Sequence, residues 1–160
     1  MNIRKASMHD LSAITAVEAE CFPEAEAATE EAFKDRLTVY PNHFWLLEDD
    51  GKLVSFINGM VTDEPTIQDE MFKNVLLHNE SGNGQAIFGV NTIPEYRQRG
   101  CAAKGMEQVI KDAKSENRKG CILTCKQELI HYYEKFGFVN IGISNSVHGG
   151  AVWYDMQLSF

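Results

Sequence analysis

The segment Val90–Lys104 combines cationic side chains with small residues in a pattern that suits a phosphate-bearing ligand. Arg97, Arg99 and Lys104 surround Gly100 in a chain whose net charge is −8. A helix that begins at this glycine would direct unpaired N–H groups and a partial positive charge toward an anion. The segment therefore predicts an anion site, with an ordinary helix start carrying a solvated basic turn as the alternative. The residues after the glycine are small enough for close approach of a ligand: Cys101, Ala102 and Ala103.

Neither of the two common nucleotide-binding loops is present in this segment. The Gly-Lys-Ser/Thr ending of a P-loop is absent, and so is the Gly-x-Gly-x-x-Gly dinucleotide fingerprint. The elements that must position the turn are a buried strand, Gln85–Ile93, and a helix that follows it. That helix is predicted from one apolar stripe at helical spacing, formed by Ala102, Met106, Val109, Ile110 and Ala113.

The rest of the chain predicts a single domain, residues 1–160, with the order β-αα-βββ-α-β-α-ββ. Alternation of apolar and polar residues and turn composition indicate mixed α/β structure with helices on both faces of a sheet. Residues Thr66–Gly84 are expected to hold a short helix followed by a loop. The expected strands are Asn2–Lys5, His43–Glu48, Leu53–Val61, Gln85–Ile93, Cys121–Cys125, Phe138–Ser144 and Ala151–Leu158. The other expected helices follow Ser7, span Thr29–Leu37 and span Leu129–Phe136.

Composition narrows the classes of partner. The chain is 44% apolar and 24% charged, with more acidic than basic residues. Nucleic acid and anionic membranes need a basic footprint, so neither is an expected partner. The acidic charge suits a cationic substrate such as an amine, or simply confers solubility. The start Met1–Asp10 has no signal-peptide pattern, and no apolar run approaches the roughly 20 residues of a membrane helix, which predicts a cytoplasmic protein.

The four cysteines give no metal-site pattern. Cys121 and Cys125 are four residues apart, and no second Cys or His pair follows them at zinc spacing. On a strand both side chains would share one face, so we expect two small core residues and no bound metal.

Two motifs resemble those of the GNAT acetyltransferases. Arg97-x-x-Gly100-x-Ala102 matches that family's Gln/Arg-x-x-Gly-x-Gly/Ala motif, and the run from Tyr132 to Phe138 resembles its Tyr-x-x-Phe-Gly-Phe helix end. The predicted order of helices and strands matches the order in that family over nearly the whole chain. It implies a mixed, largely antiparallel sheet of about seven strands flanked by about four helices and splayed at a coenzyme A cleft. Within the family, the likeness is greatest to the arylalkylamine (serotonin) N-acetyltransferases.

The resemblance also implies which residues would bind the acetyl donor and assist its reaction. Acetyl-CoA would be the acetyl donor, and no metal would be needed. Tyr133 matches the tyrosine that protonates the departing thiolate, with an aromatic residue bracketing the ligand as the alternative. Val90, Asn91 and Thr92 match the strand that pairs with the pantetheine arm. The pyrophosphate loop corresponds to Gln98, Arg99, Gly100, Cys101, Ala102 and Ala103.

The residues at the expected binding site of the acceptor amine differ from the pattern of the arylalkylamine N-acetyltransferases. Those enzymes use two histidines on the fourth strand, whereas Ala86 and Phe88 stand at the matching positions here and neither can accept a proton. Candidate acceptor-site residues are Glu24, Phe88 and Thr124. The five histidines of the chain are expected at the surface, so the general base stays open, and water-relayed deprotonation of the amine is one option.

The leading functional hypothesis is acetyl transfer to a primary amine of a small molecule by direct attack in a ternary complex. A protein lysine or N-terminus is the alternative acceptor. Two alternatives belong to other functional classes. One is a coenzyme A-binding module with little catalytic activity, and the other is an α/β protein that binds no coenzyme A. The family often forms dimers, so a homodimer is left open.

Overall fold

The computed structural model describes all 160 residues, Met1–Phe160. It contains four α-helices and nine strands arranged in two sheets. The chain forms two compact units, each with its own sheet: the first comprises Met1–Gly59 and Gly89–Val109, and the second comprises Met60–Phe88 and Ile110–Phe160. The helix α3 (Cys101–Ser115) begins in the first unit and ends in the second. None of the helices is both long and apolar enough to cross a membrane.

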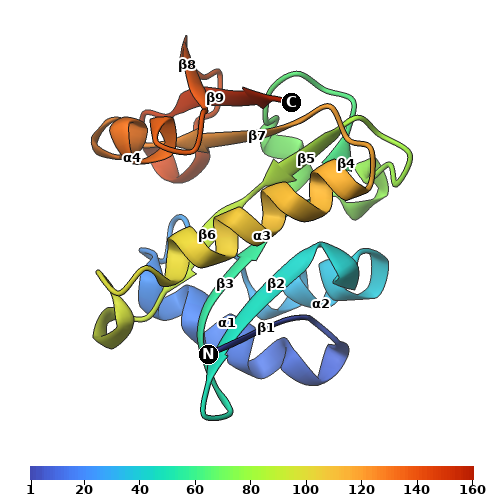
Figure 1. Ribbon diagram of the computed structural model, residues 1–160. Helices are drawn as coiled ribbons and strands as arrows, with labels where there is room; N and C mark the ends of the chain where they lie inside the picture. Colours follow the sequence, from blue (N-terminus) through green and yellow to red (C-terminus); the bar gives the residue numbers. More distant parts are fainter. The chain divides into compact units, whose positions relative to one another are not determined.

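The sheet of the first unit is wholly antiparallel. Its strands are β1 (Asn2–Lys5), β2 (Phe44–Asp49), β3 (Lys52–Asn58) and β6 (Gly89–Thr92), in the order β1-β2-β3-β6 (Figure 1). Asp50 and Gly51 join β2 to β3 with φ of 51° and 80°, the two left-handed residues that a tight hairpin turn requires. The strand β6 is the last strand in this order, so it forms one edge of the sheet.

Helices cover both faces of the first sheet. The helices α1 (Leu11–Cys21) and α2 (Glu30–Val39) pack against each other, and α1 contacts β3 and β6. The Phe33 ring of α2 lies 5.9 Å from that of Phe56 on β3. Ile57 points to the opposite face, where a Cβ on Gly105 of α3 would come within 3.0 Å of it. Because Gly89 and Asn91 pair with Asn58 and Phe56, they share the face covered by α1 and α2.

The second unit holds a mixed sheet in the order β4-β5-β7-β9-β8. The pair β5–β7 is parallel and the remaining pairs are antiparallel. The short helix α4 (Ile130–Glu134) contacts β8 and β9. Gly120 is required where β7 meets β9, because a Cβ there would lie 2.1 Å from the Leu158 carbonyl oxygen. The strands are β4 (Val61–Thr62), β5 (Gly84–Ile87), β7 (Gly120–Cys125), β8 (Val139–Ile143) and β9 (Tyr154–Ser159).

The mixed, largely antiparallel architecture with four helices is confirmed, but some predicted boundaries were wrong. The predicted strand Gln85–Ile93 is interrupted at Phe88, and its two parts pair with β7 and β3 respectively. The predicted strand Leu53–Val61 likewise ends at Asn58. Two separate 3₁₀ turns replace the short helix expected in Thr66–Gly84. A continuous apolar run shows that a segment is buried, but it does not show where the pairing partner changes.

The two cysteines of β7 are core residues, as expected. Cys121 is 1% and Cys125 2% exposed, and neither forms a disulfide. Burial raises the pKa of the Cys121 thiol to about 12 and that of Cys125 to about 11. Both thiols therefore behave as small apolar side chains at neutral pH.

Candidate active site

The Gly100 turn (Arg97–Ala103) connects β6 to α3 with an open backbone surface. Gln98 and Gly100 both have left-handed backbones, with φ of 60° and 77°. No atom lies within 4 Å of the position that a Cβ on Gly100 would take. The first backbone hydrogen bond of the helix runs from Lys104 N to Gly100 O at 3.0 Å. The preceding N–H groups therefore point out of the helix end, as an anion site requires.

The three cations around this turn are held by neutral partners. Arg97 Nε donates to Thr92 O at 3.0 Å, and Lys104 Nζ donates to Met1 O at 3.3 Å. The Arg99 guanidinium lies 4.8 Å from the centre of the Tyr96 ring. None of these contacts neutralises a charge, so the basic character inferred from the sequence persists at the folded turn.

The strand β6 offers an edge beside the turn. Two of its carbonyl oxygens already accept side-chain hydrogen bonds, Asn91 O from Ser55 Oγ at 2.6 Å and Thr92 O from Cys21 Sγ at 3.3 Å. These bonds tie β6 to β3 and α1. An edge strand can pair with an extended ligand as it would with another strand. The first unit thus brings together the predicted pantetheine strand Val90–Thr92 and the predicted pyrophosphate loop.

Tyr133, the predicted acid, lies on α4 in the second unit and is 7% exposed. Its ring is 5.2 Å from that of Tyr132 and 6.1 Å from that of Phe138. Burial raises the pKa of the Tyr133 phenol above its usual value near 10, and the neighbouring Cys125 and Tyr132 raise it further. The hydroxyl therefore keeps its proton at neutral pH, and the raised pKa makes it a weaker acid toward a thiolate than an ordinary tyrosine.

Phe88 belongs to an aromatic group in the second unit that the sequence did not reveal. The aromatic group consists of Phe72, Phe88, His148 and Trp153, all partly exposed. Phe72 lies 5.1 Å from Phe88 and 4.8 Å from His148, ring centre to ring centre. Trp153 Nε1 donates to His148 O at 2.8 Å, which fixes the indole against the turn after β8. Phe72, Phe88 and the turn that holds His148 and Trp153 are far apart in the chain, so no local pattern could have grouped them.

Thr124, another predicted acceptor-site residue, lies on β7 directly opposite Asp155 on β9. Residues directly opposite in an antiparallel pair share one face of the sheet. Burial raises the pKa of the Asp155 carboxyl, against the effect of a hydrogen bond with Ser144. The oxygen Asp155 Oδ1 is buried and has no hydrogen-bond partner. Sequence reasoning missed Asp155 because only the strand register places it beside Thr124.

Glu24, the third predicted acceptor-site residue, is exposed in the turn between α1 and α2. Pro23 O accepts hydrogen bonds from the N–H groups of Glu26 and Ala27, both at 2.9 Å, which fixes this turn. The geometry leaves the Glu24 carboxylate in solvent. An exposed position of this kind is equally that of an ordinary solvated acidic loop.

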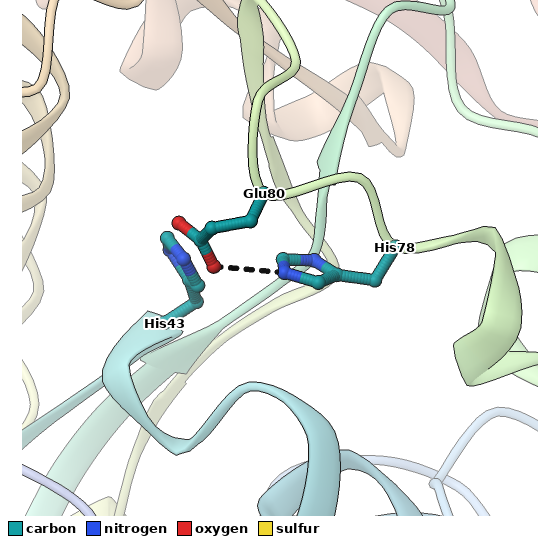
Figure 2. A group of neighbouring side chains, drawn as sticks. All are labelled: His43, His78 and Glu80. Carbon is teal, nitrogen blue, oxygen red and sulfur yellow. Dashed lines mark hydrogen bonds and ion pairs between the residues drawn. The ribbon is translucent and has the colours of Figure 1, made fainter.

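The expectation that all histidines lie at the surface was wrong for two of them. His43 is 2% exposed. The His78 side chain is 6% exposed, and its Nδ1 accepts a hydrogen bond from Val61 N at 3.0 Å. Its Nε2 lies 2.9 Å from Glu80 Oε1 (Figure 2) and must carry the ring proton, because Nδ1 is the acceptor. His78 thus ties the segment after the second 3₁₀ turn to β4, which is a structural role.

A buried polar group lies between α1, α2 and the first sheet, and sequence reasoning missed it as well. Glu18, Arg36, Asn58 and Asn91 are each less than a tenth exposed. Arg36 Nη1 donates to Asn58 Oδ1 at 2.9 Å, and Glu18 Oε2 accepts from Ala28 N at 2.9 Å. Burial lowers the pKa of Arg36, against the attraction of Tyr40 and Glu18.

A sequence signal for Glu18 was available. This residue occupies the apolar stripe of α1, four residues after Ile14 and three before Cys21. A carboxylate on the buried face of a helix is costly unless it has partners, and is therefore a candidate for a specific role.

Comparison with known proteins places these features in a family. The sequence matches the acetyltransferase (GNAT) family over residues 10–138. Serotonin N-acetyltransferase from Mesocricetus auratus is 25% identical over 112 residues, which cover 69% of this chain and 53% of that protein. This chain therefore spans about half the length of the curated relative that it matches.

Solved structures share the fold at low sequence identity. The GphF GNAT-like decarboxylase in complex with isobutyryl-CoA superposes with a TM-score of 0.86 at 19% identity, covering 99% of both chains. The loading GNATL domain of CurA from Lyngbya majuscula gives 0.82 at 18% identity, covering 99% of this chain and 96% of that one. The family match extends from α1 to Phe138 and includes the Gly100 turn and Tyr133. The chain belongs to the GNAT acetyltransferase family.

Proposed function

We propose that this chain transfers the acetyl group of acetyl-CoA to a primary amine of a small molecule by direct attack in a ternary complex. The observation that carries the proposal is the Gly100 turn. It combines a left-handed, unobstructed glycine with outward-pointing N–H groups and three cations that no carboxylate neutralises. A diphosphate carries the opposite charge and several acceptor oxygens, and it suits this turn through both charge and hydrogen bonding.

The residues that would bind acetyl-CoA lie along one stretch of chain. Gln98–Ala103 would hold the pyrophosphate, and Val90–Thr92 would pair with the pantetheine arm as an added strand. A backbone N–H of β6 directed at the acetyl carbonyl would stabilise the oxyanion that forms when the amine attacks. Tyr133 would then give its proton to the departing thiolate of coenzyme A. Its raised pKa keeps the phenol protonated when the reaction begins, and it also makes the phenol a weaker acid than an ordinary tyrosine.

The aromatic group supports a small acceptor with an apolar body. Phe72, Phe88, His148 and Trp153 offer ring faces and edges that remain partly open to solvent. Rings of this kind bury an aliphatic or aromatic carbon skeleton and leave a polar end free to react. Thr124 offers a hydroxyl on β7, and the net charge of −8 favours the approach of a cationic amine.

The experiment incubates the protein with acetyl-CoA and each amine of a panel. Turnover is measured by the release of the free coenzyme A thiol, and the product is identified by its mass. Acetylation of small primary amines, with higher kcat/KM for those with an apolar body, supports the proposal. Turnover only with peptides would instead assign a protein lysine or N-terminus as the acceptor. Saturable coenzyme A binding without turnover for any amine or peptide would reduce the chain to a binding module.

Two further outcomes complete this test. Loss of carbon dioxide from an acyl-CoA that bears a second carboxyl group would place the chain with the GNAT-like decarboxylases that share its fold. Failure of coenzyme A to raise the Tm would remove the coenzyme A site altogether, since a ligand of the native state must stabilise it. Light scattering of the same samples tests whether the chain forms a homodimer.

A further inference from the structure

One face of the second sheet carries a carboxylate that has no role in the steps proposed above. Asp155 on β9 lies opposite Thr124 on β7, so the two side chains share this face. Ile87 on β5 is level with Leu123 on β7 in the parallel register. The next residues are Phe88 and Thr124, which places these two at the same level. Phe88, Thr124 and Asp155 therefore form a row across three neighbouring strands, which we call the acceptor row.

The two ends of the acceptor row differ in chemistry. At one end, the Phe88 ring belongs to the aromatic group, with the Phe72 ring 5.1 Å away. At the other end lies the Asp155 carboxylate. Two strand spacings separate these ends, a distance of about 10 Å. A ligand that lies along the row would therefore place a carbon skeleton against the rings and a positive charge on the carboxylate.

The Asp155 carboxylate is held by the chain through one oxygen. Ser144 forms a hydrogen bond with it, and because Asp155 Oδ1 has no partner, Oδ2 is the oxygen that accepts this bond. The Ser144 hydroxyl is itself oriented, since Ser146 N donates to Ser144 Oγ at 3.0 Å. A buried carboxylate oxygen without a donor is costly, which favours a donor that a ligand supplies.

No positive charge is among the influences on the Asp155 carboxyl. Burial raises its pKa, and the hydrogen bond with Ser144 acts in the opposite direction. A cation bound beside it would stabilise the charged form. Asp155 is partly exposed, and its partner on β8 is Gly142, where no atom lies within 4 Å of the position that a Cβ would take. The carboxylate therefore has room beside it for a cationic group.

The charge requirements of the reaction decide which cation suits Asp155. The attacking amine must be neutral, and a carboxylate in contact with it would favour its charged form. The same carboxylate helps the reaction when it holds a second ammonium that does not react. That second ammonium positions the acceptor while the first nitrogen loses its proton.

We propose that Asp155 binds the non-reacting ammonium of an aliphatic diamine, whose carbon chain lies along the acceptor row against Phe88. Asp155 is then a specificity-determining residue and takes no part in proton transfer. The net charge of −8 attracts a doubly charged acceptor more strongly than a singly charged one. This proposal rests on the acetyltransferase function proposed above, and it names the class of amine that the site selects.

The test compares an unbranched alkylamine with the diamine of the same chain length, each with acetyl-CoA. In the wild type, kcat/KM should be about 10-fold to 100-fold higher for the diamine, as expected for a hydrogen bond between charged groups. In Asp155→Asn the two values should become nearly equal, through a higher KM for the diamine. Glu128→Gln, at an exposed acid of the same unit, should keep the wild-type preference.

The monoamine serves as the internal control, because it has no second ammonium for Asp155. An Asp155→Asn protein that still acetylates the monoamine but has lost the preference supports the proposal. A preference that survives in the variant would overturn it, and so would an equal loss for both substrates at an unchanged Tm. A wild type that acetylates both amines equally well would also overturn it. Asp155→Thr, which suits a strand, replaces Asp155→Asn if that variant lowers the Tm.

Binding without turnover separates failure of this proposal from failure of the proposed function. If the wild type acetylates no amine, the proposed function fails. Isothermal titration of the same diamine into the protein saturated with coenzyme A then tests Asp155. A Kd that rises at least about tenfold in Asp155→Asn supports the diamine site. An unchanged Kd, or no binding to the wild type, overturns it.

Discussion

The Gly100 turn and the aromatic group differ in how the chain builds them. The turn consists of consecutive residues and uses mainly backbone N–H groups, a left-handed glycine and the start of a helix. The aromatic group uses side chains from three separate parts of the sequence: Phe72, Phe88, and the turn that holds His148 and Trp153. A site built from backbone groups keeps its binding properties when most of its side chains vary. A site built from side chains changes its shape and polarity with each substitution. We therefore expect donor binding to be general and acceptor choice to be particular to this chain.

The largest effect should come from Gly100→Val, which places a β-branched side chain at a φ of 77° and in the path of the phosphate. We expect the Kd for coenzyme A to rise at least about 100-fold, which corresponds to about 2.8 kcal/mol of binding free energy. Isothermal titration with coenzyme A measures it. Gly51→Val is the matched control, because Gly51 has a φ of 80°, equally open surroundings and no proposed ligand. Equal Kd values for the two variants would remove the Gly100 turn from coenzyme A binding.

Tyr133→Phe should lower kcat by about 100-fold and leave the Kd for coenzyme A nearly unchanged, because only proton donation to the thiolate is lost. The pKa of the wild-type phenol is raised, so it stays protonated and the ratio of the two rates should not change from about pH 7 to pH 9. Steady-state kinetics across that range measure the ratio. Tyr132→Phe, on the adjacent and more exposed tyrosine, is the control. Unchanged turnover in Tyr133→Phe would leave the residue as packing alone.

Phe88→Ala should raise the KM for an amine with an apolar body about tenfold, since the ring contributes buried apolar area worth about 1–2 kcal/mol. The Kd for coenzyme A should not change. Comparison of KM for amines of increasing chain length measures the effect, which should shrink for the smallest amine. Phe160→Ala, at the exposed C-terminal residue, serves as the control. A KM that is unaffected for all amines would place the acceptor away from the aromatic group.

The smallest effect is expected for Arg99→Gln. Its guanidinium is exposed and lies against the Tyr96 ring. The loss of this one positive charge near the phosphate should therefore weaken coenzyme A binding only about threefold to tenfold. The difference from the wild type should shrink as salt is added, which titrations at two ionic strengths would show. Lys52→Gln removes a charge from the turn end of β3 and should have no such effect. A salt-independent loss of affinity would point to altered packing of the turn instead.

Several parts of the fold could be predicted because they depend on neighbours in sequence. The cap at Thr29, whose Oγ1 accepts from Ala32 N at 3.1 Å, and the apolar stripe of α3 are local features. The interruption at Phe88 could not be predicted in the same way. It arises because β5 finds its partner in β7 and β6 finds its partner in β3, and those partners are distant in the chain.

The same reason separates the two kinds of functional residue. The sequence by itself predicted the Gly100 turn and Tyr133 as candidate site residues, since each lies in a short motif. Only the tertiary structure brought Glu18, Asn58 and Asn91 around Gly89, and placed Asp155 beside Thr124. A helix start orders its own N–H groups through local backbone geometry. A buried carboxylate acquires its partners only when separate elements pack, and their register decides which polar atoms meet.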